Sequence, residues 1–386
     1  MVSEDQQLHV MFLPYVAPGH MMPMVDMARL FAANGIRVTI LTTTKNALSF
    51  QNSIARDVRF GQKISLEILR FPSVEAGLPE GCENLYDATS PEMHKVKLAN
   101  ELGIPRLAFS GSGFFNLCVS HNIDRYKPHD DIKLETEIFI VPGLPDKVKL
   151  TRSQLPDIVK TKNEFSSLFE ELKKAERDSF GVLVNSFYDL EAGYVDHFRK
   201  DIGIRAWSMG PVSMFNRDTD DKIERGGNSC VSKHSCLSWL GSREANSVLY
   251  ICFGSLTRFT KAQIREIACA LEESGHSFIW VVGKVSDSKD CDFWLPERFQ
   301  ENVSGKGLII SGWAPQILIL EHPAIGGFLT HCGWNSIVEG VSAGVPMVTW
   351  PVFAEQFYNE KLVTQVIKFG VPEKQWTGPS RISITP

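Results

Sequence analysis

The sequence lacks the features that define several protein classes. No apolar run in its 386 residues approaches the roughly 18 that span a bilayer, and the acidic start at Glu4 and Asp5 is unlike the basic start of a signal peptide. The 8 cysteines are scattered without a C-x-x-C pair, which disfavours a disulfide scaffold. The formal net charge of −5 provides no overall basic field for nucleic acid. We therefore expect a cytoplasmic globular protein with reduced thiols, no transmembrane segment and no nucleic-acid partner.

The remaining composition is that of an ordinary globular chain, with 43% hydrophobic and 22% charged residues. At about 150 residues per domain, the length allows two or three domains. Short continuous apolar runs alternate with helical periodicity, a pattern typical of parallel strands covered by helices on both faces. The expected strands are 10–15, 37–42, 64–71, 107–110, 181–185, 248–253, 278–282, 308–310, 327–330 and 347–350.

A polar, charged and glycine-bearing stretch at 215–235 lacks periodicity and is interpreted as a linker. It divides the chain into an N-terminal domain, 1–214, and a C-terminal domain, 236–386. We expect both to be doubly wound α/β domains that face a cleft. Ligands of such sheets bind beyond the carboxyl ends of the strands, so the loops that follow strands are where chemistry is expected.

Two of these loops are short. Ala17-Pro18-Gly19-His20 follows the first strand and opens a helix, where a neutral imidazole could accept a hydroxyl proton near pH 7 or simply hydrogen-bond to the helix backbone. Gly254-Ser255 follows a later strand and allows backbone amides to approach a phosphate, although such turns are also common without a ligand.

The third region runs from Trp313 to Gln356. Within it a strand ends at His331 and a helix begins near Asn335, so that the positive end of the helix favours a diphosphate. Ser336 and Glu339 also match a capping box, which would serve only the helix start. No metal site is expected, because no second ligand pair lies at a zinc spacing.

The motifs W-A-P-Q, H-C-G-W-N-S, G-V-P and E-Q in this region closely resemble the signature of plant secondary-product UDP-glycosyltransferases (family 1), of the saponin and flavonoid glucosyltransferase type. Pro18-Gly19-His20, Gly254-Ser255 and Asn185-Ser186-Phe187 before Leu190-Glu191 also fit that family. The resemblance implies the GT-B fold, with an acceptor-binding N-terminal domain and a UDP-sugar-binding C-terminal domain. It implies transfer of a sugar from UDP-sugar, with inversion, to a hydroxyl of a small hydrophobic acceptor of triterpenoid, steroid or flavonoid type. UDP-sugar would be a co-substrate, with no cofactor and no metal.

The resemblance also assigns residues. His20 would be the catalytic base, and Gln356 at the close of the motif implies glucose as the donor sugar. The positions implied for UDP-sugar are Trp313, Ala314 and Gln316 for the uracil, Ser255, His331, Gly333, Asn335 and Ser336 for the diphosphate, Glu339 for the ribose, and Trp334, Glu355 and Gln356 for the sugar.

The chain departs from the family pattern in two places. No strand and no matching aspartate lie between Met93 and the helix expected at 96–102, so no acidic partner is assigned to His20. A missing parallel strand would leave its neighbours unpaired or force them together. The polar stretch 372–386 lacks the family's helical continuation, and the chain therefore corresponds to a member without an internal segment and the C-terminal end.

Two alternatives to a working enzyme stay open. The first is a relative that binds UDP-sugar without turnover. The second is an NAD-dependent oxidoreductase, for which Gly111-Ser112-Gly113 is the nearest glycine motif, but Asn116 occupies its third glycine position. The acceptor, the position on it that is glycosylated and the oligomeric state stay open as well.

Overall fold

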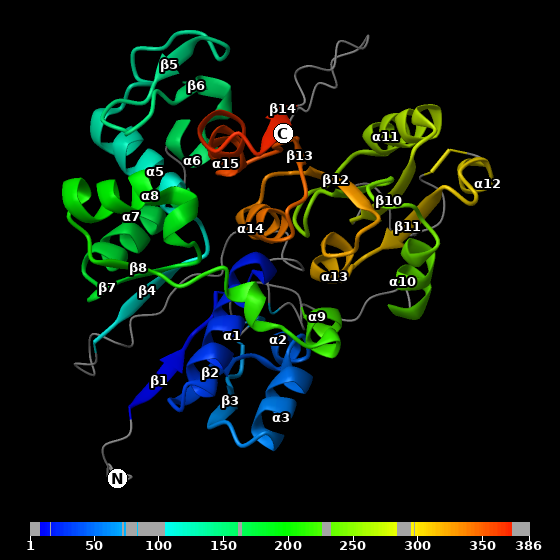
Figure 1. Cartoon of the computed structure of the whole chain (residues 1–386). Coiled ribbons are helices and arrows are strands. Elements are labelled where there is room, and N and C mark those ends of the chain that lie inside the picture. Colours follow the sequence, from blue (N-terminus) through cyan, green and yellow to red (C-terminus); the bar gives the residue numbers. More distant parts are fainter. Residues whose placement is uncertain are drawn as a thin grey trace. The chain divides into compact units, whose positions relative to one another are not determined.

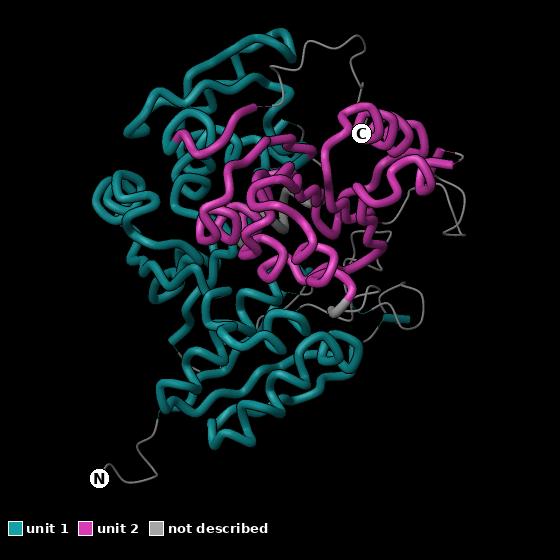
Figure 2. The backbone as a smooth tube through the Cα atoms, turned by 45° about the vertical axis from the view of Figure 1, so that its right-hand side comes forward, with its two compact units in different colours: residues 1–227, 353–367 teal, residues 228–352, 368–386 magenta. Residues whose placement is uncertain are grey.

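A computed structural model describes residues 8–15, 17–71, 73–74, 83, 105–160, 164–225, 233–283, 295–296 and 298–372. The chain forms two compact units, coloured separately in Figure 2. Unit 1 comprises 1–227 and 353–367, and unit 2 comprises 228–352 and 368–386. The division expected from the sequence placed 353–367 in the second domain. The structure corrects this, because α15 (Gln356–Lys361) packs against α5 (Phe114–Tyr126) of unit 1.

Unit 2 contains one parallel sheet in the order β11-β10-β9-β12-β13-β14 (Figure 1). Numbered within the unit, this order is 3-2-1-4-5-6, that of a doubly wound dinucleotide-binding sheet. The direction of winding reverses between β9 and β12, where a ligand crevice is expected. The elements are α10 (Lys233–Gly241), β9 (Val248–Cys252), α11 (Lys261–Ser274), β10 (Ser277–Val282), α12 (Phe299–Asn302), β11 (Gly307–Ser311), α13 (Gln316–Leu320), β12 (Ile325–Thr330), α14 (Trp334–Ser342), β13 (Met347–Thr349) and β14 (Gly370–Pro372).

The ends of α11 show how local sequence sets these elements. Thr260 accepts from the backbone N–H of Gln263, whose side chain accepts from the backbone N–H of Thr260, so the two form a capping box. Gly275 ends the helix at φ +66, a conformation that glycine adopts without strain. The apolar face of α11, with Ile264 and Ile267, packs on Phe278 and Trp280 of β10 in the core.

Unit 1 contains two separate parallel sheets, β1-β2-β3 and β4-β7-β8, and the antiparallel pair β5-β6. Its first elements are β1 (His9–Phe12), α1 (Pro18–Ala33), β2 (Arg37–Thr42), α2 (Thr44–Ala47), α3 (Gln51–Arg59) and β3 (Ile64–Ile68). From β4 (Leu107–Ser110) and α5 the chain continues through β5 (Ile138–Ile140), β6 (Lys149–Thr151), α6 (Asp157–Lys160), α7 (Glu164–Arg177), β7 (Gly181–Val184), α8 (Tyr188–His197), the π-helix η3 (Phe198–Ile202) and β8 (Ala206–Ser208). The last elements are the 3₁₀-helix η4 (Val212–Phe215), α9 (Thr219–Glu224), α15 and the π-helix η5 (Leu362–Val366).

The two sheets of unit 1 do not join in the part of the chain that the structure describes. β1 pairs only with β2 there, and β4 pairs only with β7. Met11 on β1 is 54% exposed and Leu107 on β4 is 42% exposed. The sequence predicted that a missing parallel strand would leave its neighbours unpaired or force them together; among the described residues β1 and β4 are not paired with each other, and the segment on which the prediction turns, 87–102, lies outside those residues. Phe109 and Leu183 still pack against the core that contains Phe12, so one core lies beneath both sheets.

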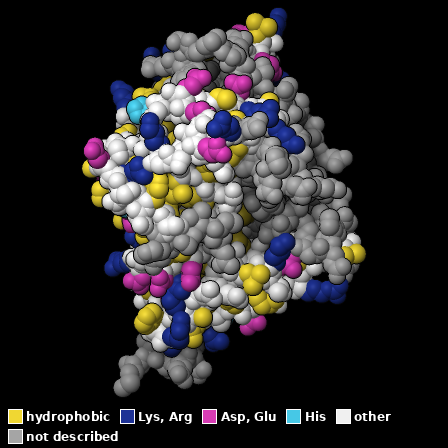
Figure 3. Space-filling view, turned by 90° about the vertical axis from the view of Figure 1, so that its right-hand side faces the viewer, with side chains coloured by type: hydrophobic (Ala, Val, Ile, Leu, Met, Phe, Trp, Pro, Cys, Tyr) yellow, Lys and Arg dark blue, Asp and Glu magenta, His cyan; other side chains and the backbone are white. Residues whose placement is uncertain are grey.

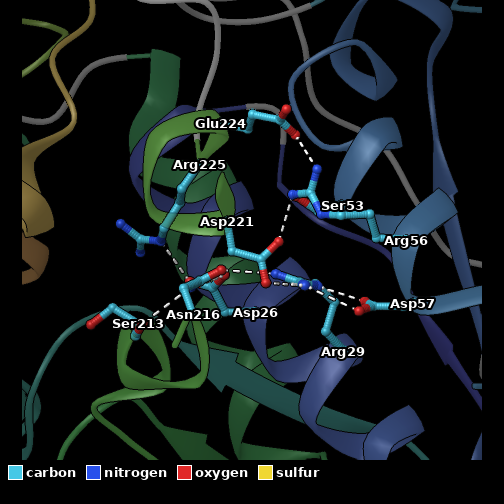
Figure 4. Close-up of polar contacts among 10 residues, drawn as sticks. All are labelled: Asp26, Arg29, Ser53, Arg56, Asp57, Ser213, Asn216, Asp221, Glu224 and Arg225. Carbon is cyan, nitrogen blue, oxygen red and sulfur yellow. Dashed lines mark hydrogen bonds and ion pairs between the residues drawn. The ribbon is translucent and has the colours of Figure 1, made fainter. Parts of the chain in front are cut away.

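The stretch interpreted as a linker is partly structured. Its charged residues 219–224 form α9, and Asp221 is only 7% exposed because Arg29 and Arg56 both pair with it (Figure 4). The interpretation of this part as linker was wrong, because charges that suggest a solvated segment instead form buried ion pairs. Residues 226–232 lie outside the described part.

Two expectations concern residues that the structure does not describe: the departure at 87–102 and the C-terminal stretch 373–386.

The cysteines within the described part, at 118, 236, 252, 269 and 332, are free thiols. None of the described helices combines the length and apolarity that crossing a membrane requires. On the face shown in Figure 3, described basic and acidic side chains are intermixed, as expected for a small net charge.

Candidate active site

The imidazole of His331 lies between two glycines at the point where the sheet of unit 2 reverses its winding. Gly254 follows β9, and His331 and Gly333 follow the neighbouring strand β12. A Cβ atom at position 254 or at position 333 would come within 2.4 Å of His331 Nε2. Burial lowers the pKa of His331 to about 4, although a backbone hydrogen bond at Cys252 opposes the shift. His331 is therefore neutral at pH 7, and the glycines bring backbone amides close to it.

The helix α14 begins directly after this histidine with Gly333, which has no side chain, at its N-cap, and Ser336 lies inside the helix and not at its N-cap. The alternative in which Ser336 and Glu339 serve a capping box is therefore wrong. Both are engaged by Gln316, whose Nε2 donates to Ser336 Oγ at 3.2 Å and to the Glu339 carboxylate at 2.8 Å. The first turn of α14 provides the positive end of a helix, which suits an anion.

Gln316 is itself oriented by a buried tyrosine that the sequence reasoning did not identify. The hydroxyl of Tyr250 on β9 donates to Gln316 Oε1 at 3.2 Å, which directs the amide nitrogen of Gln316 toward Glu339. The signal for it was an aromatic residue with a polar tip inside an apolar strand, because a buried tyrosine hydroxyl usually finds a partner. Gln316 opens α13 directly after Trp313 and Ala314, so the structure brings the expected uracil and ribose residues together.

The other expected donor residues of unit 2 differ in accessibility. Ser255 follows Gly254, and its backbone oxygen accepts from Arg258 at 2.9 Å. Asn335 is partly buried in the first turn of α14. Trp334 is only 3% exposed, so its side chain belongs to the interior.

In unit 1, His20 is the third residue of α1, which Pro18 opens at a position that tolerates a missing N–H. Its side chain reaches solvent, and its ring meets Tyr15 edge to face with the centroids 5.5 Å apart. A Cβ atom on Gly111, which directly follows β4, would lie 3.2 Å from His20 Nδ1. The loops after β1 and β4 therefore meet at His20, although the two strands do not pair. In the sequence, Gly111 stands out only as the first glycine of the motif Gly111-Ser112-Gly113.

The electrostatic surroundings of His20 favour its neutral form. Loss of hydration lowers the pKa of His20, and the negative charge of Glu355 opposes that shift. Within the described ranges, no carboxylate is hydrogen-bonded to the His20 ring. Two effects therefore set how readily His20 accepts a proton. The loss of hydration disfavours the charged imidazolium, and the negative charge of Glu355 favours it.

Glu191 fixes the loop that contacts His20. Its carboxylate accepts from the backbone N–H groups of Phe114 and Phe115, at 3.1 and 2.7 Å, and from the hydroxyl of Ser186. These amides open α5, so a buried carboxylate holds a helix end that would otherwise be uncapped. The Ser186 and Glu191 pattern noted in the sequence thus holds the β4–α5 turn in place.

Glu355 and Gln356 belong to unit 1, whereas the other expected UDP-sugar residues belong to unit 2. Gln356 is 4% exposed, and its Oε1 accepts from the backbone N–H of Phe353 at 3.0 Å. The predicted residues therefore form two sets: His20 with Glu355 and Gln356 in unit 1, and the positions from 255 to 339 in unit 2.

Comparison with known proteins gives consistent relatives. Residues 218–372 match the family model described as UDP-glucoronosyl and UDP-glucosyl transferase. The chain is 47% identical to UDP-glucose flavonoid 3-O-glucosyltransferase 7 of Fragaria ananassa, with 95% of this chain and 81% of the relative aligned. It is 45% identical to scopoletin glucosyltransferase of Nicotiana tabacum, with 96% and 85% aligned. The alignment with the Fragaria protein spans 403 residues, more than the 386 of this chain, so the relative has residues that this chain lacks within the aligned region.

Solved structures agree with the sequence relatives. The structure of Glycyrrhiza uralensis UGT73P12 with glycyrrhetinic acid 3-O-monoglucuronide superposes with a TM-score of 0.86 at 43% identity, covering 95% of this chain and 81% of that one. Medicago truncatula UGT71G1 with UDP-glucose gives a TM-score of 0.75 at 28% identity, covering 96% and 86%. Both matches extend over the two units of this chain.

Proposed function

The chain belongs to the UDP-glycosyltransferase family of plant family 1 enzymes with the GT-B fold, and we propose that it transfers glucose from UDP-glucose to a hydroxyl of a small hydrophobic acceptor with inversion. As a member of this family it is an enzyme that transfers a glycosyl group from a UDP-sugar to a small molecule. The relatives named for flavonoid and scopoletin acceptors support a flat aromatic acceptor, and the Glycyrrhiza structure supports a triterpenoid. The reaction needs no cofactor, because UDP-glucose is itself a substrate.

The donor site in this proposal is the reversal point of the unit 2 sheet. The diphosphate lies against the first turn of α14 and the backbone near Gly254 and His331, where the positive end of the helix stabilises the negative charge that grows on departing UDP. Glu339, held by Gln316, accepts from the ribose hydroxyls. Trp313 stacks on the uracil. The Medicago relative, solved in complex with UDP-glucose, supports UDP-glucose as the donor.

His20 is the base. A hydroxyl proton of the acceptor moves to the ring nitrogen that does not face Gly111 as the hydroxyl oxygen attacks the anomeric carbon. The bond between that carbon and the diphosphate oxygen breaks, and UDP leaves with the electron pair, which inverts the anomeric centre. General base catalysis of this kind contributes typically 10²–10⁴-fold. The charge of Glu355 stabilises the imidazolium that forms.

The observation that carries this proposal is the joint placement of Gln316, Ser336 and Glu339 beside the start of α14 at the reversal point. To test it, the purified chain is incubated with UDP-glucose and a flavonol, a coumarin or a triterpene, and products are identified by mass spectrometry. We expect a glucoside that disappears in His20→Ala while UDP affinity stays unchanged. Turnover of UDP-glucose that survives in His20→Ala would refute the role of His20 as the base.

A second candidate function is binding of UDP-sugar without turnover. It is favoured by the two sheets of unit 1, which do not join among the described residues, and by the lack of a described carboxylate hydrogen-bonded to His20. Calorimetry with UDP, run beside the product assay, distinguishes the candidates, because this alternative predicts a bound nucleotide and no glucoside with any acceptor.

The free thiols at the described cysteines support a reducing compartment such as the cytoplasm for either function.

A further inference from the structure

α1, the helix that carries His20, also carries two buried charged residues that tie it to other parts of unit 1 (Figure 4). The Nε and Nη2 atoms of Arg29 donate to the two carboxylate oxygens of Asp57 on α3, at 2.6 and 3.1 Å. Nη2 also donates to Asp221 on α9 at 2.8 Å, and Nη1 donates to Asn216 Oδ1 at 2.8 Å. Arg29 is 2% exposed, so this arrangement is well shielded from water.

The second buried charged residue of α1, Asp26, is also bound by Asn216, the residue that contacts Arg29. Asn216 Nδ2 donates to Asp26 Oδ1 at 2.9 Å, and Arg225 Nε donates to Asp26 Oδ2 at 2.8 Å. Asp26 is 1% exposed. Asn216 therefore bridges the two charged residues of α1, and the helix is held between α3 on one side and the segment 216–225 on the other.

This arrangement restricts rotation and sliding of α1. Charge-assisted hydrogen bonds have narrow geometry, and the guanidinium fork of Arg29 is bound in several directions at once. Turning a helix by about 10° moves a side-chain tip roughly 5–6 Å from its axis by about 1 Å. A displacement of that size at a reacting group can cost on the order of 10² in rate.

His20 depends on this restraint because little else fixes its side chain. It precedes Asp26 by less than two turns of the same helix, is exposed, and lies beside the ring of Tyr15 and beside Gly111, where an added Cβ atom would come within 3.2 Å of its Nδ1. In the described part of the chain its ring donates no hydrogen bond to a carboxylate. The orientation of the ring is therefore inherited from the backbone of α1.

We propose that Arg29 is a positioning residue for His20: its buried contacts with Asp57, Asp221 and Asn216 fix α1, and α1 in turn fixes the base. The inference rests on the proposed function for its consequence in turnover, but not for its structural content. It also explains why a buried ion network is found here, since a network of this kind adds little net stability compared with apolar packing.

The test compares two arginines of the same cluster. Arg29→Lys keeps the charge but loses the fork on α1, whereas the control Arg56→Lys loses the fork that holds Asp221 and Glu224 from α3. The ring resonances of His20, assigned with His20→Gln in protein labelled at histidine, are recorded for each variant. Turnover per folded molecule and UDP affinity are measured alongside.

We expect Arg29→Lys to shift the His20 resonances and to lower kcat by about 10–100-fold with unchanged UDP affinity. Arg56→Lys should lower thermal stability while leaving the resonances and kcat near those of the unaltered chain. If Arg29→Lys does not fold, Asn216→Leu takes its place, because it breaks the bridge while every charge keeps a partner.

A folded Arg29→Lys or Asn216→Leu variant whose His20 resonances match the unaltered chain would overturn the proposal. An equal shift in Arg56→Lys would also overturn it, because the cluster would then act through general stability. If the chain shows no turnover at all, the proposed function fails while the resonances still decide whether Arg29 positions His20.

Discussion

The amide nitrogen of Gln316 donates to the carboxylate of Glu339 across 2.8 Å, joining the start of α13 to the middle of α14. Glu339 is only 5% exposed. The contact with Gln316 fixes the orientation of its carboxylate. A carboxylate held in this way suits a pair of adjacent hydroxyls such as those of a ribose.

Replacing Glu339 by Gln should weaken UDP binding about 10–100-fold. The amide keeps the shape but removes the charge and one acceptor, and a hydrogen bond to a charged group contributes roughly 1.5–3 kcal/mol, with about 1.4 kcal/mol per tenfold in affinity. Calorimetry with UDP measures the change. Glu301→Gln on α12 is the matched control, because that side chain is 70% exposed and pairs only with Arg298 among the described residues. Equal affinities for both variants would contradict the ribose role.

The two glycines beside His331 allow steric and backbone effects to be separated. Gly254→Ala introduces both a clash at 2.4 Å and strain at φ +76, whereas Gly333→Ala introduces the same 2.4 Å contact at an ordinary φ of −61. Gly305→Ala, at φ +78 with open space around it, introduces strain alone, of about 1 kcal/mol. We expect UDP affinity to fall in the first two variants and to persist in the third, with melting temperature and calorimetry as readouts. A Gly333→Ala variant that binds UDP normally would show that the His331 contact is not needed.

Much of the framework was predictable from local sequence. The strands expected at 37–42 and 107–110 are β2 and β4, residue for residue, and Gly275, a residue type typical of helix ends, ends α11. These elements are defined by short apolar runs and by turn residues, which act within a few positions of the chain. Tertiary packing has little influence on where such segments begin and end.

The errors arose where a side chain has two local options and a distant partner decides. Ser336 and Glu339 have the spacing of a capping box, but Gln316, about twenty residues earlier, takes both. Asp221 belongs to a charged stretch that suggests solvent, yet Arg29 and Arg56 bury it. The helix α15 follows the donor motif directly, but its contacts place it in unit 1. None of these pairings has a signal within the local sequence.

The unpaired edges of unit 1 predict uneven backbone protection. Residues of a parallel strand direct their amides alternately to the two sides, so β1 and β4, paired on one side only in the described chain, leave about half of theirs without a strand partner. Hydrogen–deuterium exchange should be faster in β1 and β4 than in β2, which is paired on both sides within the same unit. Protection of β4 equal to that of β2 would show that another segment covers the edge.

The pH dependence of turnover should report the surroundings of His20. Because loss of hydration lowers its pKa below the usual 6.5, the neutral base persists as the pH falls through 6.5, and kcat/KM should decline only at a lower pH. Glu355 raises the pKa of His20, so Glu355→Gln should move this decline to still lower pH and reduce kcat, since the imidazolium loses a stabilising charge. Glu360→Gln, in the same helix but without a described influence on His20, is the control. A decline centred above pH 6.5, or an unmoved one in Glu355→Gln, would mean that the titrating group is not His20 in this environment.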